Sequence, residues 1–440
     1  MRYKNTSLRW QTGCIVISLF FTLSLHAEQQ NNQQPLPDPL SLKQALDLSM
    51  LTHPDLQIAF ARLEKAYAQQ AVQDSDQGIQ VNLKIQPQWA KFTESGEKTG
   101  DSYANINITK KLYDFGYTRS LKRASESEIA HYKHQLRESL LQHRLNIIQA
   151  FYQVILADLR YTFDDEEMSQ LYVKFDRMRE RYQRGMLTEI KMLQAKNRYQ
   201  EQLDIRTASG YQRQIARQQL ALILNRPDQL PGEVIIPAIS KPTLEMDDFK
   251  KLYAMLLNTN PRLKALRHKV KAMRNTLHAQ KAQFNPTISA FIDINEYERS
   301  LSSSTDIRIG LQFNLPIYLG GKKQALGRMA YADFLTSRNQ LRQLEYVLRG
   351  QLLELLSQLN VLKVSRQTAN ERVTLQDRTL DRQRALYELE IQANMGTALA
   401  NITRAQLQAT KVELNITLTL TQIDALLGKP FTTYPKENKP

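Results

Sequence analysis

Four segments of the chain alternate apolar and polar residues, a pattern typical of β-strands with two chemically different faces. They span residues 79–89 and 103–112 in the first half and 287–296 and 305–316 in the second. The best-patterned runs are about 9–11 residues long, the length of a tilted membrane strand. The residues predicted to face the membrane are Val81, Leu83, Ile85, Trp89, Ile106, Ile108, Ile288, Ile292, Ile307, Ile309, Leu311 and Phe313.

The alternation alone fits two structures. A half-buried sheet packed on helices would show the same pattern as a pair of membrane strands. The secretory leader described below and the lack of other core-forming segments favour the membrane strand. Polar loops at residues 91–100 and 298–305 connect the members of each pair.

Long helical segments follow each strand pair. Residues 117–183, 67 in number, contain neither glycine nor proline, which predicts a helix of about 100 Å. Apolar residues recur along it at steps of three and four, forming a packing stripe that includes Ile147, Phe151 and Ile155. A helix of this length needs partners along its side.

Glycine and cap residues mark the turns of two predicted hairpins, at residues 117–225 and 322–427. Gly185 with Thr188 predicts the first turn, and Asn394 to Thr397 carries the same signals in the second. Ser41 predicts a helix start, and Pro54 the start of a second helix. We expect this pair of short segments and the return leg of the hairpin to stack end to end along the long helix.

The chain is a tandem repeat. Residues 53–56, 112–116 and 224–227 return as 260–263, 317–321 and 427–430, at offsets of 207, 205 and 203 residues. This period is far longer than that of solenoid repeats, so each half is a complete structural unit. The predicted organisation is a signal peptide at 1–27, a tether at 28–40, repeat one at 41–230, a linker at 231–246, repeat two at 247–430 and a tail at 431–440.

The first residues predict export from the cytoplasm. A basic leader precedes a short apolar run that ends near Ala27, as in a signal peptide. The only cysteine, Cys14, precedes that run, so we expect no lipid anchor and no disulfide in the mature chain. The net charge is +15, but basic residues are spread among glutamine and glutamate, which indicates a solvated surface rather than a nucleic-acid interface.

Four membrane strands per chain predict an oligomer. Four strands cannot close a barrel, and an open edge in lipid leaves backbone groups without hydrogen bonds. Two chains would give eight strands and a filled interior, whereas three chains give twelve strands and a lumen. The predicted fold is therefore an α+β membrane protein, a homotrimeric 12-stranded β-barrel continuous with a long periplasmic α-helical barrel.

The duplicated motifs support this fold. Residues 112–116, 316–321 and 182–195, in their repeated order, resemble the TolC-like outer-membrane efflux protein family across about residues 38–430. The resemblance implies an exit duct in the outer membrane of a Gram-negative bacterium. It also implies a periplasmic adaptor and an inner-membrane transporter as partners, for efflux or type I secretion of drugs, metal ions or proteins.

The resemblance places an entrance gate and an adaptor-docking tip near the hairpin turns. By alignment to the family, Lys191, Asn401 and Arg404 take positions that are often aspartate, and Thr397 takes an arginine position. This departure predicts a neutral to basic entrance. The predicted tip residues are Arg184, Gly185, Thr188, Lys191, Asn394, Met395, Gly396, Thr397, Asn401 and Arg404.

Other candidate sites favour no further chemistry. His131 and His134 lie one helical turn apart, but no carboxylate or cysteine completes a metal site. The acidic run 164–167 predicts a solvated helix face, and Asp114 belongs to a strand-to-helix turn. No catalytic triad, phosphate loop or cofactor motif is present in the sequence, so we expect neither an enzyme nor a bound cofactor. The alternative function is a periplasmic adaptor or coiled-coil scaffold without a pore.

Overall fold

A computed structural model of the chain describes residues 35–48, 53–91, 98–237, 249–298, 305–389 and 394–429. The predicted signal peptide, most of the tether, part of the linker and the tail lie outside these residues. All elements described below belong to the compact unit that begins at Leu36.

The first half of the chain contains two short helices, a strand pair and a helical hairpin. The helices α1 and α2 span Leu42–Leu48 and Pro54–Ser75, and the strands β1 and β4 span Ile79–Gln86 and Tyr103–Tyr113. The hairpin is formed by α3 (Tyr117–Gln183) and α4 (Glu189–Ile223). The 67 residues of α3 are the segment without glycine or proline.

The second half repeats this order. The helices α5 and α6 span Phe249–Thr259 and Pro261–Ala282, and the strands β5 and β6 span Thr287–Tyr297 and Ile307–Asn314. The hairpin consists of α7 (Lys322–Glu388), again with 67 residues, and α8 (Met395–Leu426). A small ribbon, β2 (Trp89–Lys91) with β3 (Lys98–Gly100), is present only in the first half of the described chain.

The first repeated motif starts a helix in each half. Pro54 and Pro261 occupy the first turns of α2 and α6, where no backbone donor is needed. His53 caps α2 by accepting from the Asp55 N–H at 3.2 Å, and Asn260 caps α6 by accepting from the Leu263 N–H at 3.0 Å. The duplication therefore preserves a start signal.

The last repeated motif ends a helix in each half. Asn225 and Gly428 have φ values of 56° and 63°, the left-handed conformation that closes a helix. The Arg226 N–H then donates to the Ala221 carbonyl at 2.8 Å, and the Lys429 N–H donates to the Asp424 carbonyl at 3.0 Å. Both bonds satisfy carbonyls that would lack partners at the helix end.

The middle motif turns each strand pair into its long helix. Two consecutive left-handed residues make the turn, Phe115 and Gly116 in one half and Gly320 and Gly321 in the other. The Asp114 carboxylate accepts from the Thr118 N–H at 3.1 Å, so this acid stabilises the start of α3, as the sequence predicted.

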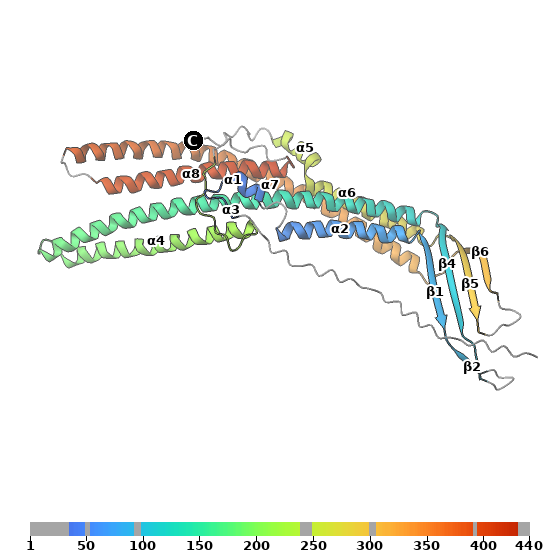
Figure 1. The fold of residues 1–440 in the computed structure, drawn as a ribbon. Coiled ribbons are helices and arrows are strands. Elements are labelled where there is room, and N and C mark those ends of the chain that lie inside the picture. Colours follow the sequence, from blue (N-terminus) through green and yellow to red (C-terminus); the bar gives the residue numbers. More distant parts are fainter. Residues whose placement is uncertain are drawn as a thin grey trace, which may run out of the picture. The chain divides into compact units, whose positions relative to one another are not determined.

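The long helix α3 is the centre of the packing. Both α2 and α4 lie along it, and it also packs against α6 and α8 of the other half. The buried stripe predicted on α3 contributes Ile147, Phe151 and Ile155 to a core shared with Leu220 of α4. In Figure 1 the sheet lies at one end of the helices and the hairpin tips lie at the other.

The end of the predicted tether is part of this core, contrary to the prediction. Leu40 is fully buried, and its N–H donates to the Glu233 carbonyl at 2.8 Å. The Ile235 N–H in turn donates to the Leu40 carbonyl at 3.0 Å. The tether and the linker therefore pair with each other, an interaction between distant segments that no local pattern announces.

Replacing Gly428 with alanine tests the repeated stop signal. A Cβ there would lie 2.7 Å from the Thr259 carbonyl oxygen, at a φ of 63°, so we expect a loss of about 1–2 kcal/mol or more in stability. Gly350→Ala is the matched control, because Gly350 lies inside α7 with open space around it. That variant should gain about 0.5–1 kcal/mol. Thermal unfolding followed by helical circular dichroism measures both, and equal shifts would contradict the prediction.

Candidate functional site: the sheet and the hairpin tips

The four-stranded sheet has the order β1-β4-β5-β6, with every neighbouring pair antiparallel. The strands from the two halves therefore join at β4 and β5. Strands β1 and β6 form the two edges, and within the described residues no strand pairs with their outer sides. The sheet of the described residues is therefore open at both edges and offers them for pairing with further strands.

One face of the sheet carries the predicted apolar residues in register. One row across the strands joins Val81, Ile108, Ile292 and Ile309, and the next joins Leu83, Ile106, Ile294 and Ile307. The edge residues are open to the surroundings, as the 75% exposure of Ile309 shows. Among the described residues no helix packs against this face. The face is contiguous and largely apolar, so water is an unfavourable neighbour for it.

The opposite face is polar and linked by hydrogen bonds between side chains. Asn107 donates to Asp293 at 2.6 Å and Asn105 donates to Asn295 at 2.7 Å. Arg308 of β6 lies 3.6 Å from Asp293. The two faces therefore have the chemistry of a wall with lipid on one side and water on the other.

Two strand predictions need correction. Trp89 does not belong to β1, which ends at Gln86, because Pro87 has no N–H for the ladder. Trp89 instead begins β2, and its side chain is 82% exposed. Strand β6 is also shorter than the predicted range 305–316, since it ends at Asn314, before Pro316.

The first hairpin tip is closed by Gly185, as predicted. Its φ of 73° lets the Met186 N–H donate to the Arg181 carbonyl at 2.9 Å. Arg184 is the C-cap residue of α3. Thr188 then caps α4 and Lys191 lies exposed in its first turn. All residues from 181 to 186 at this tip are exposed to solvent.

The second tip is built differently, and the prediction for Gly396 was wrong. Gly396 lies in the first turn of α8, after the cap residue Asn394, and not in a left-handed turn. Its lack of a side chain instead makes room for Gln170 of α3, which a Cβ at this position would overlap. Thr397 donates to the Asn394 side chain at 2.9 Å, and Met395 and Asn401 are partly buried.

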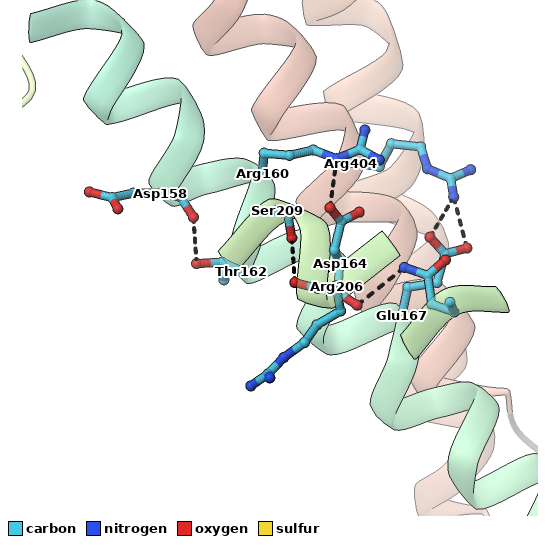
Figure 2. A network of polar contacts seen from close by, with 9 residues as sticks. Asp158, Arg160, Thr162, Asp164, Glu167, Arg206, Ser209 and Arg404 are labelled. Carbon is cyan, nitrogen blue, oxygen red and sulfur yellow. Dashed lines mark hydrogen bonds and ion pairs between the residues drawn. The ribbon is translucent and has the colours of Figure 1, made fainter. Parts of the chain in front are cut away.

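The acidic run at 164–167 is not a solvated face, which corrects the sequence interpretation. Figure 2 shows two of these acids, Asp164 beside Arg160 of α3 and Glu167 beside Arg404 of α8. Asp164 is fully buried and accepts from Arg160 at 2.8 Å, and Asp165 accepts from Arg206 of α4 at 2.8 Å. Glu167 accepts from Arg404 of α8 at 3.0 and 3.2 Å. Acids and bases distant in sequence thus neutralise one another.

This pairing changes the predicted entrance charges. Arg404 lies over the Phe163 ring, 4.8 Å from its centre, and its charge is compensated by Glu167. Lys191 is exposed, and no ion pair is found for it among the described residues. Of the two cations expected at the entrance, Lys191 is the one whose charge is not locally compensated.

The histidines pack between α3 and α6. His131 Nδ1 lies 2.8 Å from the Ala265 carbonyl, and the rings of His134 and His268 stack with centres 5.3 Å apart. Burial lowers the pKa of all three, and neighbouring cations such as Lys264 lower that of His134 further. Within the described residues, no group of three potential ligands could hold a metal ion.

These features define a channel protomer: a lipid-compatible sheet segment at the end of two long helical hairpins. The sequence profile described as "Outer membrane efflux protein" matches residues 45–226 and 252–429, and the chain belongs to this family. The two matched segments fall on the two halves of the repeat. The family consists of channels rather than enzymes, in agreement with the sequence prediction.

Individual relatives support the same assignment. The "Cation efflux system protein CusC" of Escherichia coli O157:H7 is 24% identical over 353 residues, covering 76% of this chain and 74% of the relative. The CusC crystal structure aligns with a TM-score of 0.72 at 17% identity, covering 88% of this chain and 92% of that one. The Campylobacter jejuni CmeC outer membrane channel aligns with a TM-score of 0.73 at 15% identity, covering 88% and 85%. The predicted TolC-like fold is confirmed.

None of the helices in the described residues combines the length and the apolarity of a membrane-spanning helix.

The contact between Glu167 and Arg404 is testable by a double-mutant cycle. We expect Glu167→Gln and Arg404→Gln to show a coupling of about 0.5–1 kcal/mol, because the pair is partly exposed. The matched control is Asp176 with Arg179, an exposed pair within α3 alone, for which we expect about 0.3–0.5 kcal/mol or less. Thermal unfolding measures both cycles. Additive effects of the Glu167 and Arg404 substitutions would show that the contact between the hairpins carries no energy.

The partly buried histidines between α3 and α6 predict acid sensitivity. Their folded-state pKa values lie below the ordinary value of 6.5, so the unfolded chain binds more protons and stability falls as the pH drops below about 6.5. A variant with His134→Gln and His268→Gln should lose less stability between pH 7.5 and 5 than the unmodified protein. His278→Gln is the control, because His278 is exposed. Unfolding temperatures across this range give the comparison, and parallel curves for all three proteins would refute it.

Proposed function

We propose that the chain forms a homotrimeric exit duct in the outer membrane of a Gram-negative bacterium. The observation that carries this proposal is the four-stranded sheet, apolar and uncovered on one face, with unpaired strands at both edges. Three copies would close a 12-stranded barrel and satisfy every edge. The helical hairpins would then form a tube that extends into the periplasm.

The hairpin tips are the proposed contact points for other components. We infer that a periplasmic adaptor binds there and connects the duct to an inner-membrane transporter. Exposed apolar side chains at the first tip, among them Met186 and Ile190, support a protein-binding surface. The relatives named above include a cation efflux protein; a metal ion, a drug or a secreted protein are the candidate substrates for this chain.

Biochemical fractionation separates the duct from an adaptor or scaffold. A duct should appear in the outer-membrane fraction as trimers that dissociate only on heating. An adaptor or scaffold would be extracted by high salt without detergent. Deletion of the gene, assayed for drug and metal sensitivity and for loss of a secreted protein, separates efflux from type I secretion.

The entrance charge is the second part of the proposal. We infer that Lys191, repeated three times around the entrance, disfavours cations. In planar bilayers with a salt gradient, the reversal potential of the unmodified channel should show no strong cation selectivity. Lys191→Asp should shift it towards cations, whereas Lys250→Asp on α5 should not. Strong cation selectivity of the unmodified channel would contradict this inference.

A further inference from the structure

Both connections from strand to long helix expose large apolar side chains. After β6, Ile317 is 93% exposed and Tyr318 is 84% exposed. At the end of β4, Tyr113 and Phe115 are exposed, and their rings make an edge contact with centres 4.7 Å apart. We call these four residues the junction cluster. It lies at the end of the sheet that joins the helices. Its side chains are exposed and are not part of the buried helical core.

A β-bulge makes the junction cluster continuous with the apolar face of the sheet. Lys111 pairs with Ser289, but the next pair on β5, Ile288, is with Tyr113, so Leu112 is the extra residue. The bulge places Tyr113 in the same row as Ile288 and Phe313. The apolar band therefore reaches the strand ends, where aromatic residues in membrane barrels meet the lipid headgroups.

Basic side chains accompany the junction cluster. Lys110 is exposed in a row of the apolar face, beside Ile79 and Ala290, and Lys322 and Lys323 are exposed at the start of α7. Four connections between helix and strand lie at this end of the sheet: α2 to β1, β4 to α3, α6 to β5 and β6 to α7. Further exposed cations near them are Arg119, Lys122, Arg123, Lys281 and Arg328. The acids at these connections are Asp74 and Asp76 at the end of α2 and the buried Asp114, which is held by Thr118 and Lys111. Cations therefore predominate at this end of the sheet.

We propose that the junction cluster and its lysines bind anionic phospholipid in the periplasm-facing leaflet of the outer membrane. The proposal rests on the orientation given by the proposed duct. The apolar and aromatic side chains enter the lipid interface, and the ammonium groups of Lys110, Lys322 and Lys323 extend to headgroup phosphates. Each lysine near an anionic surface contributes at most roughly a fivefold preference, so the class of ligand is an anionic phospholipid rather than a zwitterionic one.

Native mass spectrometry of the full-length protein in detergent tests the proposal. The trimer is titrated with phosphatidylglycerol or with phosphatidylcholine of the same acyl chains, and the two dissociation constants are compared. We expect a preference of roughly tenfold for phosphatidylglycerol. The double variant Lys322→Gln, Lys323→Gln should reduce it to less than about threefold. The matched control Lys250→Gln, Lys251→Gln removes two exposed lysines from α5 and should retain it.

A second variant separates the two parts of the site. Ile317→Ser with Tyr318→Ser should weaken both lipids alike and leave their ratio unchanged, because it removes apolar contacts only. Equal affinity of the unmodified trimer for the two lipids would overturn the proposal, as would an unchanged preference in the Lys322 and Lys323 variant. The same spectra report the assembly: a trimer without lipid preference contradicts the lipid site alone, whereas a monomer contradicts the proposed duct.

Discussion

The backbone groups on the outer edges of β1 and β6 are the constraint on which the rest of the structure depends. Each edge strand has donors and acceptors that no described strand pairs with. In the hydrocarbon region of a bilayer no water is present to pair with them, and hydrocarbon offers no hydrogen bonds. The single chain is therefore a fragment of its functional form.

The two halves of the tandem repeat use the same few turn and cap residues to start, join and end their elements. In each half a proline starts the short helix, two left-handed residues join strand to long helix, and one left-handed residue ends the return helix. These are the positions where the sequence repeats most clearly, since turn and cap geometry tolerates few residue types. Between them the two halves diverge, because many apolar side chains can fill a packing stripe.

The halves differ most at the hairpin tips and in the contacts between hairpins. Gly185 closes its turn through a positive φ, whereas Gly396 allows close approach of Gln170. Asp164, Asp165 and Glu167 are paired with arginines of α3, α4 and α8, respectively. A sequence pattern reports spacing along one element, so it indicated an acidic helix face but not Arg206 and Arg404, which lie 41 and 237 positions away from their partners.

The sequence by itself determined the four strands of the sheet to within a few residues, the 67-residue helix α3, the turn at Gly185 and the duplicated order, because periodicity and cap chemistry are local properties. It also determined the apolar face of the sheet, since alternation assigns each strand residue to one side. Only the tertiary structure decided that β4 and β5 join the halves and that Leu40 belongs to the core. It alone also placed Tyr113 on the apolar face through the bulge at Leu112. These features depend on which distant segments meet, and that is set by packing in three dimensions.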